Sequence, residues 1–321
     1  MRQADETSDG AARPDIDQAF AHIARGAAAD AGGDPLTALR RFVDAYGGVA
    51  GPLPVDGVTL LPVTADGVAA EWIVPAGCAD DARLVYLHGG GWVAGGLVSH
   101  RPLAAALARE TGAPVLLIDY RLAPEHPFPA GLDDCRRALA WAARFGPRGE
   151  AEAARLYIAG DSAGGNLAAA ACQQAVIAGA RVPDRLVLLS PVLDGAANPA
   201  RGEGVHPDAD RAGLESVIGL YLQGAAVDDA RVSPLNAPDA VLAGMPPCLL
   251  QVSAAEYLRW DSEAFARRLV QAGARATLSL WPRMPHVWHA FLDLLPEARE
   301  AVGEIAGFLA APPPTRSPIV P

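Results

Sequence analysis

A serine flanked on both sides by glycine, two positions away, lies between an expected strand and an expected helix. Residues 160–165 are Gly-Asp-Ser-Ala-Gly-Gly, and they follow the apolar run RLYIA at 155–159. In a tight turn from strand to helix, glycines avoid steric overlap and the serine hydroxyl projects above the sheet. We therefore predict that Ser162 is a nucleophile, in preference to a simple helix N-cap.

A serine of this kind needs a general base, and the chain has seven histidines. When the serine lies at such a turn, the base comes late in the chain, after the acid that orients it. His286 lies between an expected strand at 276–281 and an expected helix at 296–310, in a loop that can face the serine. His289 is an alternative base, or a partner of His286 in a metal pair. No His-Glu-x-x-His spacing is present, so we expect no metal.

Two carboxylates follow the expected strand at 247–252, and either could orient the imidazole. Glu256 is nearer to the end of the strand, where the site should lie. Asp261 comes later and is expected to cap a helix that begins near Ser262. We favour Glu256 as the acid and keep Asp261 as the second choice.

A second glycine cluster, His-Gly-Gly-Gly-Trp at 88–92, follows another expected strand. Gly89, Gly91 and Ala94 fit the G-x-G-x-x-A fingerprint of dinucleotide-binding proteins. Asp119 ends the next strand, where an acid that binds ribose could lie. A nucleotide site is therefore one interpretation of this cluster.

An oxyanion hole is the other interpretation of the cluster. Amides of these glycines would act together with the amide of Ala163, directly after the serine. We prefer this interpretation because a serine at a tight turn serves no purpose in hydride transfer. The site is then expected to work without a cofactor.

The elements around these residues alternate between short apolar strands and longer helices. Strands are expected at 83–87, 114–119, 155–159, 185–190, 247–252 and 276–281, and helices at 100–111, 133–145, 163–179, 262–272 and 296–310. This alternation requires a sheet covered by helices on both faces, since each crossover returns over the sheet. The sequence therefore predicts an α/β fold with a mostly parallel, doubly wound sheet.

The domain organisation follows from where this alternation holds. Two amphipathic helices are expected in residues 1–50, before a main domain at 51–311. At about 195–243 the pattern weakens into Gly, Asp and Pro with one helix-like stretch, which indicates an insertion above the sheet. The Pro-rich end, 312–321, is expected to be frayed.

Composition restricts the class of protein and its partners. The 321 residues are 51% hydrophobic and carry a net charge of −11 without a basic block, which argues against a nucleic-acid partner. No apolar run reaches the roughly 18 residues that a membrane span needs. Four separated cysteines without a CxxC pair and an N-terminus without an apolar signal segment lead us to expect a cytoplasmic protein.

Five segments carry a resemblance to a known family. They are HGGGW (88–92), DYRLAPEHPFPA (119–130), GDSAGG (160–165), LSPVLD (189–194) and WPRMPHVWHAF (281–291). With the pattern of strands and helices, the chain resembles the hormone-sensitive-lipase-like branch of the α/β-hydrolase carboxylesterases from about residue 50 to 310. The resemblance implies an α/β-hydrolase fold with a helical cap made by the N-terminal helices and the insertion.

The same resemblance implies roles for individual residues. Ser162 would be the nucleophile and His286 the base, and the amides of Gly89, Gly90 and Ala163 would bind the oxyanion. Three acidic residues that match positions of the family are expected to support the site or the fold without reacting: Glu125, Asp134 and Asp161.

The acid segment departs from the family's pattern. Members of the family place an aspartate about 30 residues before the histidine, and here residues 254–262 are AAEYLRWDS. Glu256 lies 30 residues before His286, in register with the aspartate of one version of the motif. Ala255 replaces the aspartate of the other version. A glutamate can do the same work with one more methylene, if its backbone lies slightly further back.

These residues predict a serine hydrolase that cleaves carboxylic esters of short or medium acyl chains through an acyl-enzyme. Its partner would be a small-molecule ester, and a homodimer is possible. One alternative is a member of the family that catalyses elimination, cyclisation or acyl transfer, which the altered acid segment would support. Another is a small-molecule receptor without catalysis, against which the retained Ser162 and His286 argue.

Overall fold

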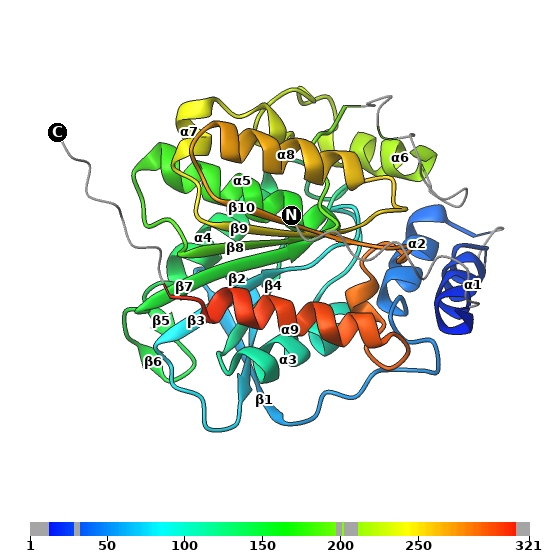
Figure 1. The fold of residues 1–321 in the computed structure, drawn as a ribbon, viewed down its shortest axis with the longest axis horizontal. Helices are drawn as coiled ribbons and strands as arrows, with labels where there is room; N and C mark the ends of the chain where they lie inside the picture. Colours follow the sequence, from blue (N-terminus) through cyan, green and yellow to red (C-terminus); the bar gives the residue numbers. More distant parts are fainter. Residues whose placement is uncertain (1–12, 29–32, 197–200, 202–210, 313–321) are drawn as a thin grey trace.

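An eight-stranded sheet runs through the centre of the molecule, with helices on both of its faces (Figure 1). The computed structural model describes residues 13–28, 33–196, 201 and 211–312. In spatial order the strands are β1 (Val58–Ala65), β2 (Val68–Pro75), β4 (Val115–Asp119), β3 (Ala82–Leu87), β7 (Arg155–Asp161), β8 (Arg185–Leu189), β9 (Cys248–Ser253) and β10 (Ala276–Trp281). A small separate pair is formed by β5 (Phe145–Gly146) and β6 (Gly149–Glu150).

The sheet is parallel from β4 to β10, and only β1 and β2 run antiparallel to their neighbours. The prediction of a mostly parallel α/β sheet is confirmed. The antiparallel start has a local cause, because Asp66 and Gly67 both take positive φ angles (50° and 83°) and close a two-residue hairpin between β1 and β2.

Helices cover the sheet in two groups. The longer helices are α1 (Pro14–Ala28), α2 (Pro35–Asp44), α3 (Leu97–Thr111), α4 (Ala130–Ala142), α5 (Ser162–Ala178), α6 (Arg211–Leu222), α8 (Arg259–Gln271) and α9 (Pro296–Ala310). Short helical turns are η3 (Pro234–Asn236), α7 (Asp239–Ala243) and η4 (Trp288–Ala290). In Figure 1, α3 and α9 lie on one face, whereas α4, α5 and α8 lie on the other.

Two apolar clusters fill the space between the sheet and these helices. Side chains of successive strand residues point to opposite faces. In β3, Val85 and Leu87 therefore join the cluster under α4, α5 and α8, while Leu84 and Tyr86 join the cluster under α3 and α9. Because both faces are buried, all six residues of this strand are buried and all but Arg83 have largely apolar side chains, as a central parallel strand requires.

The helices α1, α2 and α6 lie together beyond one end of the sheet (Figure 1). A third apolar cluster joins α1 to the segment around η4, where Ile16 and Ala19 pack with Met284, Trp288 and Phe291. The N-terminal helices are thus attached to a loop that follows the last strand.

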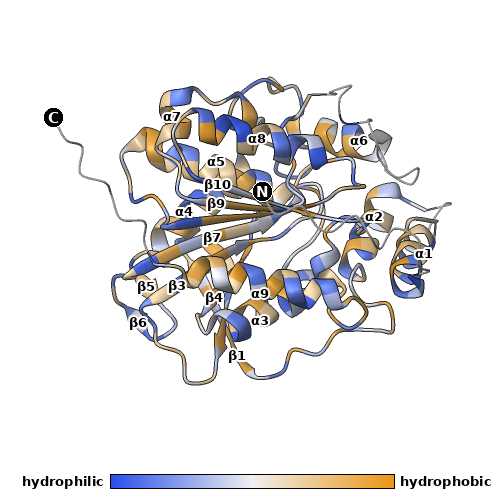
Figure 2. Cartoon of the chain, in the orientation of Figure 1, coloured by the Kyte–Doolittle hydropathy of each residue, from blue (hydrophilic) through white to orange (hydrophobic). Residues whose placement is uncertain are grey.

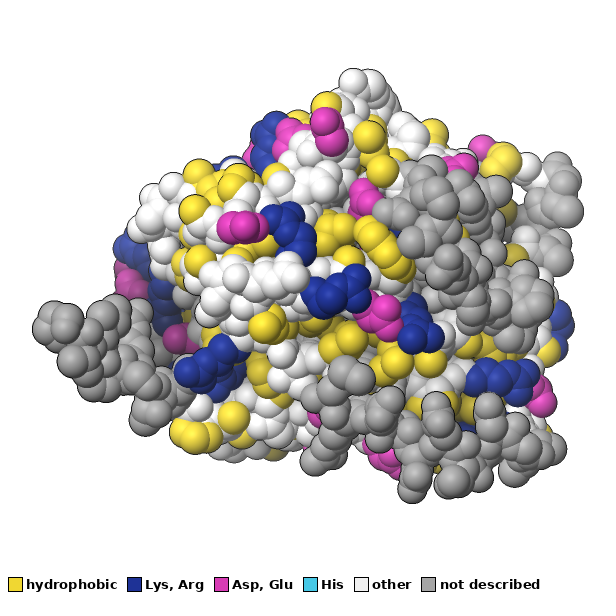
Figure 3. All heavy atoms as spheres, turned by 45° about the horizontal axis from the view of Figure 1, so that its top comes forward, with side chains coloured by type: hydrophobic (Ala, Val, Ile, Leu, Met, Phe, Trp, Pro, Cys, Tyr) yellow, Lys and Arg dark blue, Asp and Glu magenta, His cyan; other side chains and the backbone are white. Residues whose placement is uncertain are grey.

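The outer surface has mixed polarity. The outer helices α8 and α9 carry hydrophilic and hydrophobic residues on different sides (Figure 2). On the described part of the face in Figure 3, arginine, acidic and hydrophobic side chains are interspersed. Within the described ranges, no helix combines the length and the hydropathy that crossing a bilayer would require.

Candidate active site

The turn from β7 to α5 places Ser162 at the end of the strand. Ser162 takes a φ of 52°, a left-handed backbone conformation that is rare for residues other than glycine. A side chain at Gly160 would overlap the carbonyl group of Gly164, and one at Gly164 would overlap the carbonyl oxygen of Leu87. Both flanking glycines are therefore needed for the backbone to pass this closely, as the sequence motif predicts.

Ser162, His286 and Glu256 form a continuous chain of hydrogen bonds. His286 Nε2 lies 3.0 Å from Ser162 Oγ, and His286 Nδ1 lies 2.8 Å from Glu256 Oε2. An ionised carboxylate only accepts hydrogen bonds, so Nδ1 carries the proton and Nε2 is left to accept from the hydroxyl. The structure thus brings together three residues that are far apart in the sequence, in the order that a general base requires.

Glu256 is buried, and its second oxygen is held by two donors. The hydroxyl of Ser190 and the backbone N–H of Ser253 donate to Oε1 at 2.8 and 2.9 Å. These bonds leave Oε2 to face His286. The sequence motifs did not single out Ser190, although it lies in the LSPVLD segment directly after β8.

Asp261, the second-choice acid, has a different set of partners. It accepts hydrogen bonds from Arg201 Nε (2.7 Å) and from the backbone N–H groups of Leu193 (2.7 Å) and Asp194 (3.0 Å). Burial raises the pKa of this carboxyl, although the Arg201 guanidinium opposes the shift. The expectation that Asp261 caps a helix is wrong: α8 begins at Arg259, and Asp261 lies inside its first turn.

His289 lies outside the site. Its ring is fully buried, packs on Trp288 at 4.0 Å between centroids and directs Nε2 to Gln251 Oε1 at 2.9 Å. Burial lowers the pKa of His289 to about 3, so the ring is neutral at physiological pH. Because the ring is fully buried and Nε2 is directed to Gln251, His289 serves packing and is unsuited to act as the base or as a metal partner of His286.

In the glycine loop after β3, the prediction that the Gly89 amide binds the oxyanion is wrong. The N–H of Gly89 donates to Asp161 Oδ1 at 3.0 Å, so this amide points into the protein and is not available to an oxyanion. Gly90 and Gly91 line the cavity beside Ser162, with φ angles of 114° and 63°. In the described part of the chain, neither of these two amides has an acceptor.

Asp161 holds the glycine loop through its side chain. Besides the Gly89 amide, this buried carboxylate accepts from Tyr86 Oη at 2.8 Å and lies 3.3 Å from His100 Nε2. Burial raises its pKa, but His100 and the Tyr86 hydroxyl outweigh that effect, so the pKa of Asp161 lies below its ordinary value. The carboxylate therefore stays charged, and its hydrogen bonds support the loop.

The two other acidic residues of the resemblance make ion pairs away from the reacting groups. Glu125 pairs with Arg40 at 2.7 Å and connects α2 to the segment after β4. Asp134 accepts from Arg121 at 2.8 Å and from Arg137 at 2.5 Å. Both carboxylates stabilise the fold around the site.

A cavity of about 610 Å³ opens onto Ser162 and His286. This volume lies within the usual range for small-molecule sites. Part of its apolar lining comes from α2 and α6, through Leu39, Phe42, Val43, Leu214 and Val217. A side chain at Gly91 would lie 3.0 Å from Val217, so α6 packs directly over the glycine loop.

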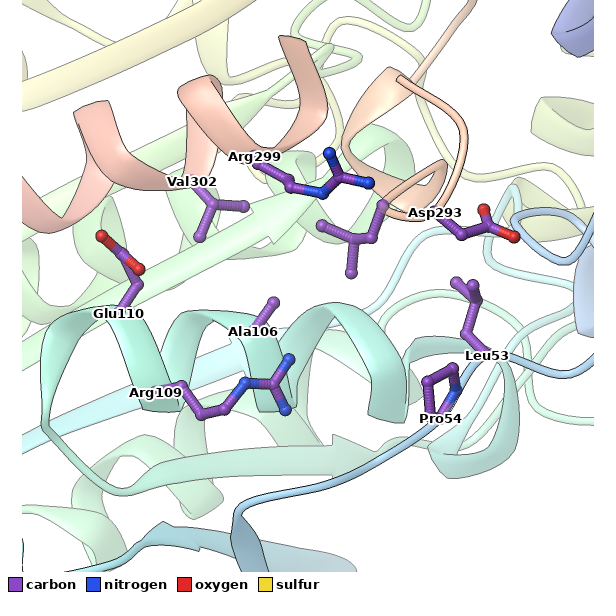
Figure 4. Close-up of a pocket in the computed structure, with 9 residues that line it drawn as sticks. Leu53, Pro54, Ala106, Arg109, Glu110, Asp293, Arg299 and Val302 are labelled. Atoms are coloured by element: carbon purple, nitrogen blue, oxygen red, sulfur yellow. The ribbon is translucent and has the colours of Figure 1, made fainter. Parts of the chain in front are cut away.

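A second pocket, of about 320 Å³, lies between α3 and α9 (Figure 4). Arg109 and Glu110 of α3 and Arg299 of α9 border it. The residues that line it include no serine, cysteine or histidine that could act as nucleophile or base. The chemistry predicted from the sequence therefore belongs to the larger cavity.

Comparisons with known proteins agree with the fold. A family model described as alpha/beta hydrolase fold matches residues 84–290. The chain is 38% identical over 275 residues to an acetyl-hydrolase of Streptomyces hygroscopicus, covering 84% of this chain and 86% of that protein. It is 37% identical over 253 residues to the carboxylesterase NlhH of Mycobacterium tuberculosis, covering 77% of each. A crystal structure of an esterase from the bacterial hormone-sensitive lipase family is similar with a TM-score of 0.83 and 36% identity, covering 93% of this chain and 98% of the other.

Proposed function

The chain belongs to the hormone-sensitive-lipase-like family of carboxylesterases with the α/β-hydrolase fold, and on this premise we propose that it cleaves esters with Ser162, His286 and Glu256. The observation that carries the proposal is the chain of hydrogen bonds from Ser162 Oγ through the imidazole to Glu256 Oε2. This is the arrangement that converts a weakly nucleophilic hydroxyl into an attacking group.

In the acylation step, His286 Nε2 takes the proton from Ser162 as its oxygen attacks the ester carbonyl carbon. The imidazolium that forms is stabilised by Glu256, whose orientation is fixed by Ser190 and Ser253. The proton then passes from Nε2 to the leaving alcohol, and an acyl-enzyme remains on Ser162. Water, activated by the same imidazole, releases the acid and restores the serine.

The developing oxyanion would be bound by the amides of Gly90, Gly91 and Ala163. Gly90 and Gly91 border the cavity, and Ala163 lies in the first turn of α5, where backbone N–H groups have no partner within the helix. Each such donor contributes about 3 kcal/mol to lowering the barrier. Gly89, whose amide is occupied by Asp161, would act only by supporting this loop.

The substrate is an uncharged ester with a short or medium acyl chain. The apolar walls from α2 and α6 favour a hydrocarbon chain, and Arg101, which also borders the cavity, pairs with Glu71 at 2.6 Å. The name of the relative called acetyl-hydrolase points in the same direction. In this proposal α1, α2 and α6 form the cap over the site, and the sheet domain supplies the reacting groups.

Initial rates on p-nitrophenyl esters from acetate to decanoate test the proposal. We expect the wild-type rate to be highest for a short or medium chain, and Ser162→Ala to remove essentially all turnover while the protein stays folded. No hydrolysis by folded wild-type protein across the series would contradict the proposal. It would instead favour a member of the family with another reaction, or a receptor.

A further inference from the structure

We propose that Tyr46 is a positioning residue whose hydroxyl holds the loop of His286, so that the N-terminal helices set the imidazole against Ser162. The inference rests on the proposed function, because it assigns a task within the same site. It concerns a residue that no sequence motif marked and that lies 240 residues from the histidine.

The contact is direct and involves the histidine's own backbone. Tyr46 Oη donates a hydrogen bond of 2.5 Å to the carbonyl oxygen of His286. Tyr46 follows α2, so the bond joins the N-terminal segment to the loop between β10 and η4. A carbonyl fixed in this way limits rotation of the peptide from which the imidazole extends.

The loop needs such restraints because its own backbone is unfavourable. Arg283 and Val287 take φ angles of 31° and 47°, in the left-handed region. For the β-branched Val287 this conformation is a genuine outlier, which persists only where surrounding contacts impose it.

Hydroxyl groups hold this loop from two sides. From the sheet side, Ser253 Oγ accepts from the N–H of Met284 at 2.9 Å, and Ser190 Oγ accepts from the N–H of Val287 at 3.4 Å. From the side of the N-terminal helices, Tyr46 donates to the carbonyl of His286. The Ser190 bond is long and therefore weak, so the Tyr46 bond is the strong restraint on the backbone of His286, while Glu256 bonds to its ring.

Tyr46 is itself well fixed. Its ring makes an edge-on contact with Phe42 at 5.5 Å and a tilted contact with Phe291 at 5.3 Å between centroids. The next residue, Gly47, approaches the backbone of Ala290 so closely that a side chain would overlap its carbonyl oxygen. Burial, followed by the negative charge of Glu256, raises the pKa of the Tyr46 hydroxyl, so it remains a donor throughout the working pH range.

The variant Tyr46→Phe removes the hydroxyl and keeps the ring. We expect kcat to fall about 3- to 10-fold on every ester of the series, the size expected for one lost hydrogen bond, while KM stays within about twofold. The rate at which a sulfonyl fluoride labels Ser162 should fall by the same factor, since labelling needs the imidazole in place. Tyr157→Phe is the matched control, because Tyr157 lies at the start of β7, away from Ser162 at its other end, and should keep wild-type kcat.

Thermal unfolding of both variants shows whether they are folded when kcat is measured. If Tyr46→Phe is less stable, kcat is measured well below its melting temperature. A wild-type kcat in Tyr46→Phe, a loss confined to KM, or an equal loss in Tyr157→Phe would overturn the assignment of Tyr46. Failure of the proposed function itself would differ, because then the wild type would neither hydrolyse the esters nor react with the sulfonyl fluoride at Ser162.

Discussion

The two sides of the active site are held in place by different means. On the nucleophile side, backbone groups approach Gly90, Gly160 and Gly164 too closely to leave room for any side chain. On the acid–base side, Glu256 and His286 are held by side-chain hydrogen bonds from Ser190 and Tyr46 and by the Ser253 amide. The nucleophile side is held by steric exclusion, whereas the acid–base side is held by individual hydrogen bonds.

This difference predicts different responses to mutation. A backbone overlap cannot be relieved without moving the sheet or the helix, so a change on the nucleophile side should affect folding. A lost hydroxyl on the acid–base side removes one of several bonds, so it should affect the rate and leave the fold intact. The following predictions test that contrast.

The largest effect is expected for Gly164→Ala. The added methyl would meet the carbonyl oxygens of Leu87 and His88, which belong to the backbone and cannot swing away. We expect little folded protein, or a melting temperature lowered by many degrees, measured by soluble yield and thermal unfolding. The control Gly307→Ala, in α9 with nothing within 4 Å, should be neutral or stabilising by up to about 1 kcal/mol. A Gly164→Ala protein as stable as wild type would remove the contrast.

A smaller but still large loss of stability is expected for Asp261→Asn. The substitution removes the carboxylate that pairs with the buried guanidinium of Arg201 at 2.6 Å, and breaking a buried ion pair typically costs about 3–5 kcal/mol. The folded fraction should keep kcat within a fewfold of wild type, because Asp261 does not touch His286. Urea unfolding and kcat, measured on the same preparation, check both parts. A stable Asp261→Asn protein that has lost catalysis would indicate that Asp261, and not Glu256, is the acid.

Ser190→Ala tests the acid–base side with a change of one hydroxyl. Glu256 Oε1 keeps the Ser253 amide, so the carboxylate is less restrained but still in place. We expect kcat to fall about 3- to 10-fold, with a melting temperature within a few degrees of wild type. Unfolded protein, or a loss of kcat as complete as that of Ser162→Ala, would contradict the contrast. It would show that the acid–base side tolerates substitution no better than the nucleophile side.

A separate effect concerns the pH dependence of stability and comes from one histidine on each side of the site. His88 and His289 are fully buried, and burial lowers the pKa of each to about 3. The unfolded chain, with an ordinary histidine pKa near 6.5, binds more protons between pH 6.5 and 3, so folding stability is lost as the pH falls through this window. Each ring accounts for about 2 kcal/mol between pH 6.5 and 5.

His289→Gln should therefore flatten the decline. The free energy of unfolding, measured with urea between pH 7 and 5, should fall less steeply in this variant than in the wild type. Parallel curves for the two proteins would mean that His289 is protonated in the folded state.

The sequence predicted what short-range patterns encode. The alternation of strands and helices, the turn at Ser162 and the order serine, acid, histidine all follow from local spacing. The structure places Ser162, His286 and Glu256 within hydrogen-bonding distance, as that reasoning expects.

The rest depends on contacts between distant segments. Nothing in the HGGGW motif indicates that the Gly89 amide is occupied by Asp161, 72 residues later. The partner of Asp261 is Arg201, 60 residues before it in the chain. Tyr46 falls in the region 1–50, for which the sequence predicts only two amphipathic helices, and its bond to His286 depends on how these helices pack. Such pairings depend on how distant segments pack in three dimensions, which sequence spacing does not determine.

In the proposed mechanism, His286 and Glu256 act as one unit to activate Ser162. This claim is tested most directly by the rate at which a sulfonyl fluoride labels the protein, with the labelled peptide identified by mass spectrometry, in wild type, Glu256→Gln and Asp261→Asn. We predict label on Ser162, a rate about 10³- to 10⁴-fold lower in Glu256→Gln, and a nearly unchanged rate in folded Asp261→Asn. Label on another residue, or a wild-type rate in Glu256→Gln, would contradict the claim.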